Sequence, residues 1–370
     1  MAQRNSRRYV FAHPLVGASS SVWRRLTRAH QVDPPFWPKA LNVTVCTAAA
    51  APLRALDRRF IRTNAPPAKP PVFIIGHWRS GTTHLHNLLC QDAQFGYVST
   101  FQTIIPGGCI SGRRILAPII RARMPTERPM DNMELTLFGP QEEEIALAHM
   151  TPCAYYHALY FPRDMRSFFD RYVMFDRIRD DERSEWASCY RALLAKASHI
   201  AGGRRLVLKN PANTGRISAL LELYPDAKFI HVYRDPYVVI PSTIHFYDRI
   251  LPITVLQRFE RTTLVDNVYA MYEALVARCL ETQSAVPARQ WAEVRFEDLE
   301  RDPIGELDRL YRTLDLGPFD ARDRVASYAE AKAGYRKNTF ELEPTVSDRI
   351  AAVSKAAVER WGYTRPGWTA

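Results

Sequence analysis

Short apolar runs along the chain predict the strands of a buried sheet. The first lies between proline and glycine at residues 72–75, and others occupy residues 205–208, 228–233 and 291–296. Segments with helical spacing follow them, at residues 84–89, at 217–223, up to Ser242 and at about 304–314, and a last helix is expected near 347–361. Strands that alternate with helices are typical of an α/β fold with a parallel sheet and helices on both faces.

Other segments of the chain lie before this alternating pattern and within it. Residues 1–65 indicate mixed helix and loop, and PPAKPP at 66–71 indicates a stiff linker that leads into the first strand. Residues of about 100–200 have aromatic and charged positions at helical spacing and few strand signals, which predicts a helical insertion. We therefore expect an N-terminal extension, residues 1–65, and a single α/β domain, residues 66–370.

The charge balance suggests an anionic partner. The chain of 370 residues has 50 Lys+Arg against 39 Asp+Glu, which gives a formal net charge of +11. Such a charge favours nucleic acid, a membrane surface or a phosphorylated small molecule as partner. Because the arginines are spread along the chain and form no basic run, we expect no nucleic-acid partner.

The cysteines and the apolar stretches indicate the cellular compartment of the protein. The six cysteines are isolated and form no CxxC pair, so metal-ligand spacing is absent and reduced thiols in a cytoplasmic protein are expected. The opening residues lack the apolar core of a secretory signal. Residues 41–53 are apolar but too short to span a bilayer, and they predict a helix that packs on the domain. Peripheral contact of that helix with lipid is the alternative.

A glycine loop follows the first predicted strand. Gly76 and Gly81 have the spacing of a P-loop, but Thr82 stands where that motif has lysine. Glycines allow successive backbone N–H groups to point at one anion, and the following helix adds its positive N-terminal end. Side chains that can contact the same anion are Arg79, Ser80, Thr82 and Thr83. The loop predicts a P-loop-type three-layer fold, and the alternative is an ordinary strand-to-helix turn.

Cations end two of the other predicted strands. Lys209 follows residues 205–208, and Arg234 follows residues 228–233. Ligands of open parallel sheets bind at the carboxyl ends of the strands. A nucleotide triphosphatase needs the loop lysine and a carboxylate that holds magnesium, and neither is obvious here. The pattern therefore favours an anionic ligand that is bound without a metal ion.

Four strings of residues, in this order, resemble the sulfotransferases that use 3′-phosphoadenosine 5′-phosphosulfate (PAPS). They are HWRSGTT at 77–83, LVLKNP at 206–211, FIHVYRDPYVVIPST at 229–243 and VRFEDLERDP at 294–303. The likeness covers roughly residues 70–365. It is closer to the bacterial and tyrosylprotein-type branch, whose loop is RSGTT, than to the cytosolic branch.

The resemblance implies how the donor would be bound. The loop residues Arg79, Ser80, Gly81, Thr82 and Thr83 would hold the 5′-phosphosulfate. Arg234 and Ser242 would hold the 3′-phosphate, and their spacing allows both to reach one phosphate. A salt-bridged turn and a helix-surface hydroxyl are the alternatives for these two. A basic segment at about 330–345, with Arg336, Lys337 and Asn338, resembles the segment that closes over the nucleotide, with a solvated basic turn as the alternative.

Sulfuryl transfer also needs cations at the developing charge and a base. Lys209 could stabilise the bridging oxygen and Arg79 the equatorial oxygens. The tyrosylprotein branch has a glutamate shortly after the first helix, but residues 97–102 contain no carboxylate. The GPQEEE string at 139–144 resembles the PQE-x-E element of bacterial members. We expect Glu142 to be the general base, with Glu144 second and His77 third, and helix-dipole complementation as the alternative for the glutamates.

These features predict a sulfotransferase that moves a sulfuryl group from PAPS to a hydroxyl by in-line transfer, without a metal. The acceptor would be a small molecule, a lipid or a carbohydrate, and the helical region at about 100–200 would wall its pocket. Two alternatives remain open at the level of sequence. One is a P-loop kinase that acts on a small molecule, and the other is a protein that binds a nucleotide without turnover.

Overall fold

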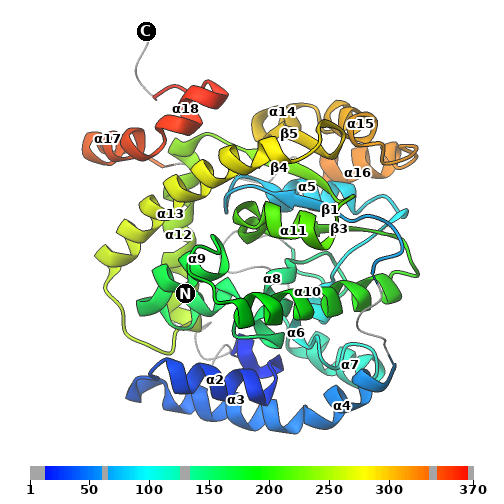
Figure 1. The fold of residues 1–370 in the computed structure, drawn as a ribbon, viewed down its shortest axis with the longest axis vertical. Helices are drawn as coiled ribbons and strands as arrows, with labels where there is room; N and C mark the ends of the chain where they lie inside the picture. The colour runs from blue at the N-terminus through cyan, green and yellow to red at the C-terminus, as the bar shows by residue number, and fades with distance from the viewer. Residues whose placement is uncertain (1–12, 61–65, 126–133, 333–339, 366–370) are drawn as a thin grey trace. The chain divides into compact units, whose positions relative to one another are not determined.

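A computed structural model describes residues 13–60, 66–125, 134–332 and 340–365 of the chain (Figure 1). The chain divides into two compact units. Unit 1 comprises Met1–Ala68, Tyr97–Gly203 and Phe246–Arg261, and unit 2 comprises Lys69–Gly96, Arg204–His245 and Thr262–Ala370. No helix in the described ranges has the length and apolar character needed to cross a membrane.

Unit 2 contains a parallel five-stranded sheet. Its strands, given in the spatial order β2-β3-β1-β4-β5, are β2 (Phe95–Gly96), β3 (Arg205–Lys209), β1 (Val72–Ile75), β4 (Lys228–Tyr233) and β5 (Trp291–Arg295). The predicted α/β fold with a central parallel sheet is confirmed. The two-residue strand β2 was missed, because so short a run has no periodicity to detect. Phe296, expected in the last strand, begins a helix instead.

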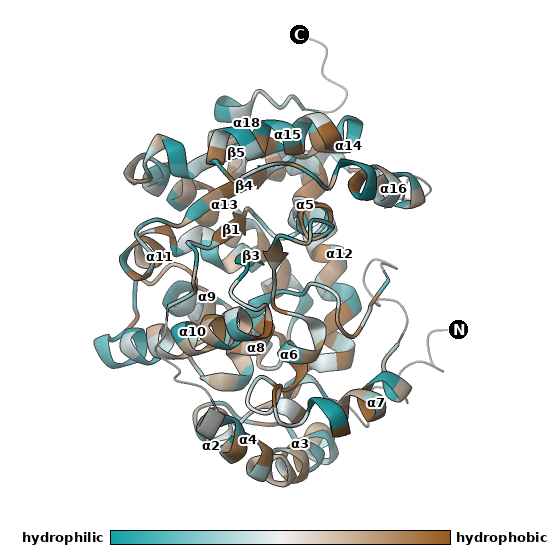
Figure 2. Cartoon of the chain, turned by 90° about the vertical axis from the view of Figure 1, so that its right-hand side faces the viewer, coloured by the Kyte–Doolittle hydropathy of each residue, from teal (hydrophilic) through white to brown (hydrophobic). Residues whose placement is uncertain are grey.

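Burial explains why β1, with β3 and β4 beside it, forms the centre of the sheet. All four residues of β1 are fully buried, so their backbone groups must be paired by neighbouring strands. Ile74 pairs with Lys209 of β3 and with Ile230 of β4. Figure 2 shows the hydrophobic colour on β3. β1 therefore lies between β3 and β4, and the residues that follow these three strands emerge at one edge.

Helices follow the strands of this sheet along the chain. They are α5 (Thr82–Leu89), α11 (Ile217–Leu223), α12 (Pro236–Thr254), α13 (Arg261–Thr282), α14 (Phe296–Arg301), α15 (Pro303–Leu314), α16 (Arg322–Lys332), α17 (Pro344–Val353) and α18 (Lys355–Trp361). Short 3-10 helices lie at Pro211–Gly215, Gln283–Ala285 and Ala288–Gln290. The single helix expected near 347–361 is two helices, α17 and α18, which are separated at Ser354.

The described part of unit 1 is mainly helical. Its helices are α2 (Ser20–Ala29), α3 (Trp37–Ala49), α4 (Ala51–Phe60), α6 (Thr100–Ile104), α7 (Arg113–Arg123), α8 (Glu143–Met150), α9 (Met165–Tyr172) and α10 (Asp180–Ile200). Short 3-10 helices lie at Pro14–Gly17, Pro34–Phe36, Tyr155–Leu159 and Pro162–Asp164. The apolar stretch at 41–53, expected to be one helix, spans the end of α3 and the beginning of α4.

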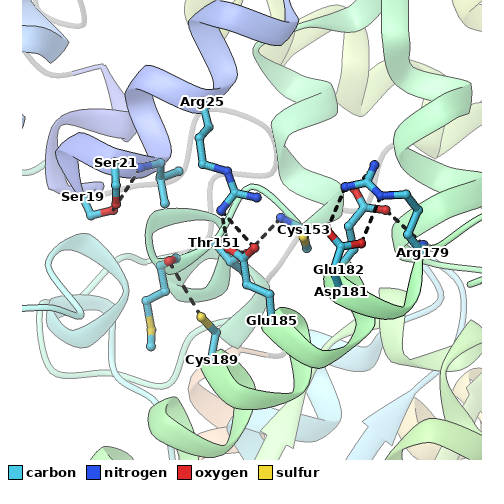
Figure 3. Close-up of polar contacts among 12 residues, drawn as sticks. Ser19, Ser21, Arg25, Thr151, Cys153, Arg179, Asp181, Glu182, Glu185 and Cys189 are labelled. Atoms are coloured by element: carbon cyan, nitrogen blue, oxygen red, sulfur yellow. Dashed lines mark hydrogen bonds and ion pairs between the residues drawn. The ribbon is translucent and has the colours of Figure 1, made fainter.

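The N-terminal helices are tied to the rest of unit 1 by polar contacts (Figure 3). Arg25 of α2 donates hydrogen bonds to both carboxylate oxygens of Glu185 of α10, at 2.8 and 2.9 Å. The Thr151 hydroxyl donates to the same carboxylate at 2.8 Å and accepts from the Cys153 backbone N–H. Glu185 therefore joins α2, α10 and the segment that follows α8.

A buried carboxylate joins α4 to the segment that leads into α7. Asp57 of α4 accepts hydrogen bonds from the backbone N–H and the hydroxyl of Ser111. The buried ammonium of Lys196 on α10 lies 3.4 Å from the same carboxylate and also donates to the Pro106 carbonyl. Because both charged groups are out of water, each depends on its hydrogen-bond partners.

Removal of this carboxylate should destabilise the protein strongly. Asp57→Ala leaves the Lys196 ammonium buried without its counter-charge, so we expect a loss of about 3–5 kcal/mol in the free energy of unfolding. Urea unfolding followed by circular dichroism measures the loss. The control is Arg25→Ala, which removes a half-exposed ion pair and should cost about 1 kcal/mol or less. Equal unfolding midpoints for the two variants would contradict the prediction.

Candidate active site

The loop between β1 and α5 requires glycine at both of its ends. Gly76 has φ +138° and Gly81 has φ +98°, conformations that residues with a Cβ rarely adopt. A Cβ on Gly76 would lie 2.2 Å from the Val232 carbonyl oxygen. A Cβ on Gly81 would lie 2.0 Å from a ring carbon of Phe296. The backbone therefore turns tightly against β4 and the start of α14.

The Thr214 hydroxyl holds the first residue of this loop. The Gly76 N–H donates to Thr214 Oγ1 at 2.8 Å, and the same hydroxyl donates to the Gly76 carbonyl at 3.0 Å. Thr214 belongs to the buried 3-10 helix that follows β3. The sequence analysis missed this residue, because nothing in the NPANTG string marks a threonine that would return to the glycine loop.

Three of the residues predicted to bind the donor come together in unit 2. Arg79 Nε donates to Ser242 Oγ of α12 at 3.1 Å, and Arg234 Nη1 lies 3.5 Å from the Arg79 carbonyl oxygen. The Arg234 guanidinium lies over the Phe296 ring, 4.2 Å from its centroid. Arg234 is half-buried, and this burial lowers the pKa of its guanidinium. Phe296, which fixes Arg234 and borders Gly81, was not singled out from the sequence.

The loop also holds a buried hydroxyl with unsatisfied hydrogen-bonding capacity. Ser80 Oγ is enclosed and has no hydrogen-bond partner among the described residues. An unpaired buried hydroxyl is costly, so such an atom fits a ligand oxygen. Thr82 and Thr83 form the first turn of α5, where backbone N–H groups lack helical partners. These features fit an anion such as the phosphosulfate of PAPS.

Lys209 ends β3 beside β1, as its pairing with Ile74 requires. The side chain is buried, with 1% of its surface exposed. Burial and the Lys209 charge lower the pKa of nearby His86 to about 3, so this imidazole is neutral at pH 7. His86 is placed as a hydrogen-bond donor to the Val207 carbonyl at 3.2 Å. Lys209 thus lies buried where β3 ends beside β1.

His77 lies inside the loop in a neutral state. Burial lowers the pKa of His77 to about 4, and its Nδ1 lies 2.7 Å from the Trp78 carbonyl oxygen. With Ser80, Arg234 and His231 it lines a cavity of about 20 Å³, which has room for about one water molecule. A base with so low a pKa takes up a proton weakly at pH 7. This geometry does not favour His77 as the general base.

The candidate carboxylates belong to unit 1 and differ in their surroundings. Glu142 directly precedes α8, which begins at Glu143. Glu142 is half-buried and accepts a hydrogen bond from the Tyr156 hydroxyl. Glu144 is fully buried and accepts from the Tyr155 backbone N–H at 2.8 Å. Glu144 therefore fixes the chain after α8, whereas Glu142 keeps an accessible part.

Three of the predicted donor contacts belong to the basic segment at about 330–345. Arg336, Lys337 and Asn338 lie outside the described residues. Their role towards a nucleotide stays a prediction.

Comparison with known proteins identifies relatives along almost the whole chain. The sulfotransferase family matches residues 70–321. Omega-hydroxy-beta-dihydromenaquinone-9 sulfotransferase Stf3 of Mycobacterium bovis is 34% identical over 377 residues, which cover 98% of this chain and 95% of Stf3. Stf3 of Mycobacterium tuberculosis matches to the same extent.

Two solved structures show the same fold. Sulfotransferase STF9 of Mycobacterium avium has a TM-score of 0.67 at 17% identity, over 95% of this chain and 98% of STF9. Sulfotransferase STF1 of Mycobacterium tuberculosis has a TM-score of 0.64 at 18% identity, over 90% of each chain. The family match supports sulfuryl transfer against the two alternatives that the sequence had left open, a small-molecule kinase and a protein that binds a nucleotide without turnover. Since the family match covers most of the chain and the Stf3 relatives align from end to end, this chain belongs to the sulfotransferase family and is an enzyme of sulfuryl transfer.

Proposed function

We propose that this enzyme transfers the sulfuryl group of PAPS to the terminal hydroxyl of a hydrophobic lipid of the menaquinone type. The observation that carries the donor assignment is the group formed by Arg79, Ser242 and Arg234 around a loop with the unpartnered hydroxyl of Ser80. The acceptor class rests on the likeness to Stf3, whose name specifies an omega-hydroxy dihydromenaquinone.

Residues of unit 2 would hold the two anionic ends of the donor. Backbone N–H groups of the loop and the first turn of α5, with the hydroxyls of Ser80, Thr82 and Thr83, would bind the 5′-phosphosulfate. Arg234 and Ser242 would bind the 3′-phosphate through charge-assisted hydrogen bonds. The 3.1 Å contact between Arg79 and Ser242 supports this assignment, because it joins the loop to α12 within unit 2.

The chain's own charges would then favour transfer. PAPS supplies an electrophilic sulfuryl group when it is bound. Lys209, at the end of β3, places a buried ammonium where negative charge develops on the phosphate side of the bond that breaks. Arg79 places a guanidinium beside the loop for the sulfuryl oxygens. Charges that are fixed before the reaction need little reorganisation, so they lower the barrier more than mobile water does.

Glu142 is the proposed general base. Its carboxylate would accept the proton of the acceptor hydroxyl as that oxygen forms its new bond to sulfur. The Tyr156 hydroxyl donates to one oxygen of Glu142, which fixes the orientation of the carboxylate. Glu144 is second, because its carboxylate is already engaged with the Tyr155 backbone N–H.

The donor site is tested by calorimetric titration with adenosine 3′,5′-bisphosphate. We expect the enzyme to bind this product, and Arg234→Ala to weaken binding roughly ten- to hundredfold, because a charge-assisted hydrogen bond is lost. Arg301→Ala removes an exposed cation from unit 2 and is the control, with binding unchanged. Folded enzyme that binds no bisphosphate at high concentration would rule out the donor assignment.

Lys209→Ala should lower kcat roughly a hundredfold or more, because a preorganised cation is removed from the transition state. Binding of adenosine 3′,5′-bisphosphate and the circular dichroism spectrum show whether the variant keeps its fold. Turnover is measured with radiolabelled PAPS and an omega-hydroxylated menaquinone analogue. Full activity of the variant would show that Lys209 has no role in transfer.

Glu142→Gln should lower kcat roughly 100- to 10,000-fold while nucleotide binding is kept, because glutamine cannot accept the proton. Glu144→Gln is the matched comparison: its amide oxygen can still accept from the Tyr155 N–H, so most of the activity should remain. The two variants are compared by kcat at several pH values. Loss of activity in Glu144→Gln alone would reverse the assignment of the base.

A further inference from the structure

α3 of unit 1 presents a row of large apolar side chains to solvent. Trp37, Leu41 and Val45 are 61%, 66% and 59% exposed. Because they are spaced four residues apart, they lie on one face of the helix. The buried residues of α3, Val43 and Thr47, lie on another face. A surface helix normally turns such a row inward, so the apolar face of α3 lacks a partner within the described chain.

α7 repeats this arrangement. Ile115 and Ile119, again four residues apart, are 64% and 44% exposed, while Ala117 is buried. Leu56 of the intervening helix α4 is 45% exposed. Seven large hydrophobic side chains are exposed among the described residues, and six of them belong to α3, α4 and α7. Scattered exposed hydrophobics are ordinary, but a concentration on three helices indicates an interaction surface.

The three helices lie together at the lower end of unit 1 in both views (Figures 1 and 2). α4 follows α3 after one residue, and Asp57 of α4 binds the backbone of Ile110 and Ser111 just before α7. Glycines at 107 and 108 pack against Arg54 and Leu53 of α4. The apolar rows are thus carried on helices that are held to one another. We call α3, α4 and α7 the apolar surface.

Cations, without exposed acids, accompany the apolar side chains. α7 contains Arg113, Arg114, Arg121 and Arg123 and no acidic residue. α3 has no acidic residue, and the acid of α4, Asp57, is buried and bonded to Ser111. Arg113 and Arg121 lie over the Phe138 ring, 4.9 and 5.6 Å from its centroid. Arginines beside tryptophan and aliphatic side chains match the headgroup and acyl layers of an anionic bilayer.

We propose that the apolar surface binds anionic phospholipid membranes. Trp37, Leu41 and Ile115 would enter the boundary between headgroups and acyl chains, and the arginines of α7 would contact lipid phosphates. The charge of this surface favours a membrane over a second copy of the chain, because the same arginines would then face one another. The inference goes beyond the proposed reaction, since it concerns residues outside the donor and base sites.

Vesicle co-sedimentation tests the proposal with the full-length enzyme. Vesicles of phosphatidylcholine mixed with phosphatidylglycerol should bind the enzyme, and added salt should weaken binding. Vesicles of phosphatidylcholine alone should bind it much less. Leu41→Ser/Ile115→Ser should lower the affinity roughly tenfold for each side chain, because less apolar area enters the membrane. Ile200→Ser removes an exposed hydrophobic from α10 and should bind as the wild type does.

The role of the cations needs its own pair of variants. Arg114→Glu/Arg123→Glu should abolish the preference for phosphatidylglycerol. Arg301→Glu/Arg312→Glu makes the same change in net charge at exposed residues of unit 2 and should keep the preference. Equal effects of the two charge variants would show that net charge, and not this surface, directs binding.

Three further outcomes would overturn the proposal. They are absence of vesicle binding by the wild type, equal binding by Leu41→Ser/Ile115→Ser and Ile200→Ser, and self-association in gel filtration that the first variant abolishes. Binding of adenosine 3′,5′-bisphosphate by the same variants is measured in parallel. Because the apolar surface lies outside the donor site, this binding should stay unchanged, and failure of membrane binding remains distinct from failure of the proposed reaction.

Discussion

The pair of hydrogen bonds between Gly76 and the Thr214 hydroxyl is the constraint on which the proposed donor site depends. Thr214 follows β3, Gly76 follows β1, and Val232 of β4 leaves no space for a Cβ at Gly76. The ends of three neighbouring strands therefore set the path of one loop. A loop positioned by strands holds its N–H groups in place before a ligand arrives, which lowers the entropy lost on binding.

The same arrangement explains how buried cations are tolerated here. Lys209 is almost completely buried, and burial lowers the pKa of Arg234, so both cations have given up part of their hydration. Stacking on Phe296 and the contact with the Arg79 carbonyl recover a part of that cost for Arg234. An anion that carries several negative charges would recover more. A site of this kind favours an anionic ligand over a neutral one, as the proposed donor requires.

Much of unit 2 could be predicted from the sequence, because its strands are buried on both faces and appear as continuous apolar runs. The positions of the glycine loop, Lys209 and Arg234 at strand ends follow from the apolar runs, and Ser242 was singled out through the family resemblance, while the roles of all of them stay predictions. Thr214 and Phe296 were missed, since their roles arise from contacts between segments far apart in the chain. In unit 1 aromatic residues of the region at about 100–200, such as Phe101 and Phe169, are buried, and a role in an acceptor pocket stays a prediction. Aromatic composition alone cannot distinguish a core from a pocket wall.

Net charge alone says little about the binding partner, because the positions of the cations in the structure decide which ligand they can contact. Of the cations behind the +11 balance, the proposed donor site uses Arg79, Lys209 and Arg234, each held by packing or hydrogen bonds in unit 2. The arginines of α7 form a different group, exposed and set beside apolar rows. Buried cations select one ligand through fixed geometry, whereas exposed cations act through a screened field that any anionic surface satisfies. The two groups therefore fit the two different partners proposed for them, a nucleotide for the first and a lipid bilayer for the second.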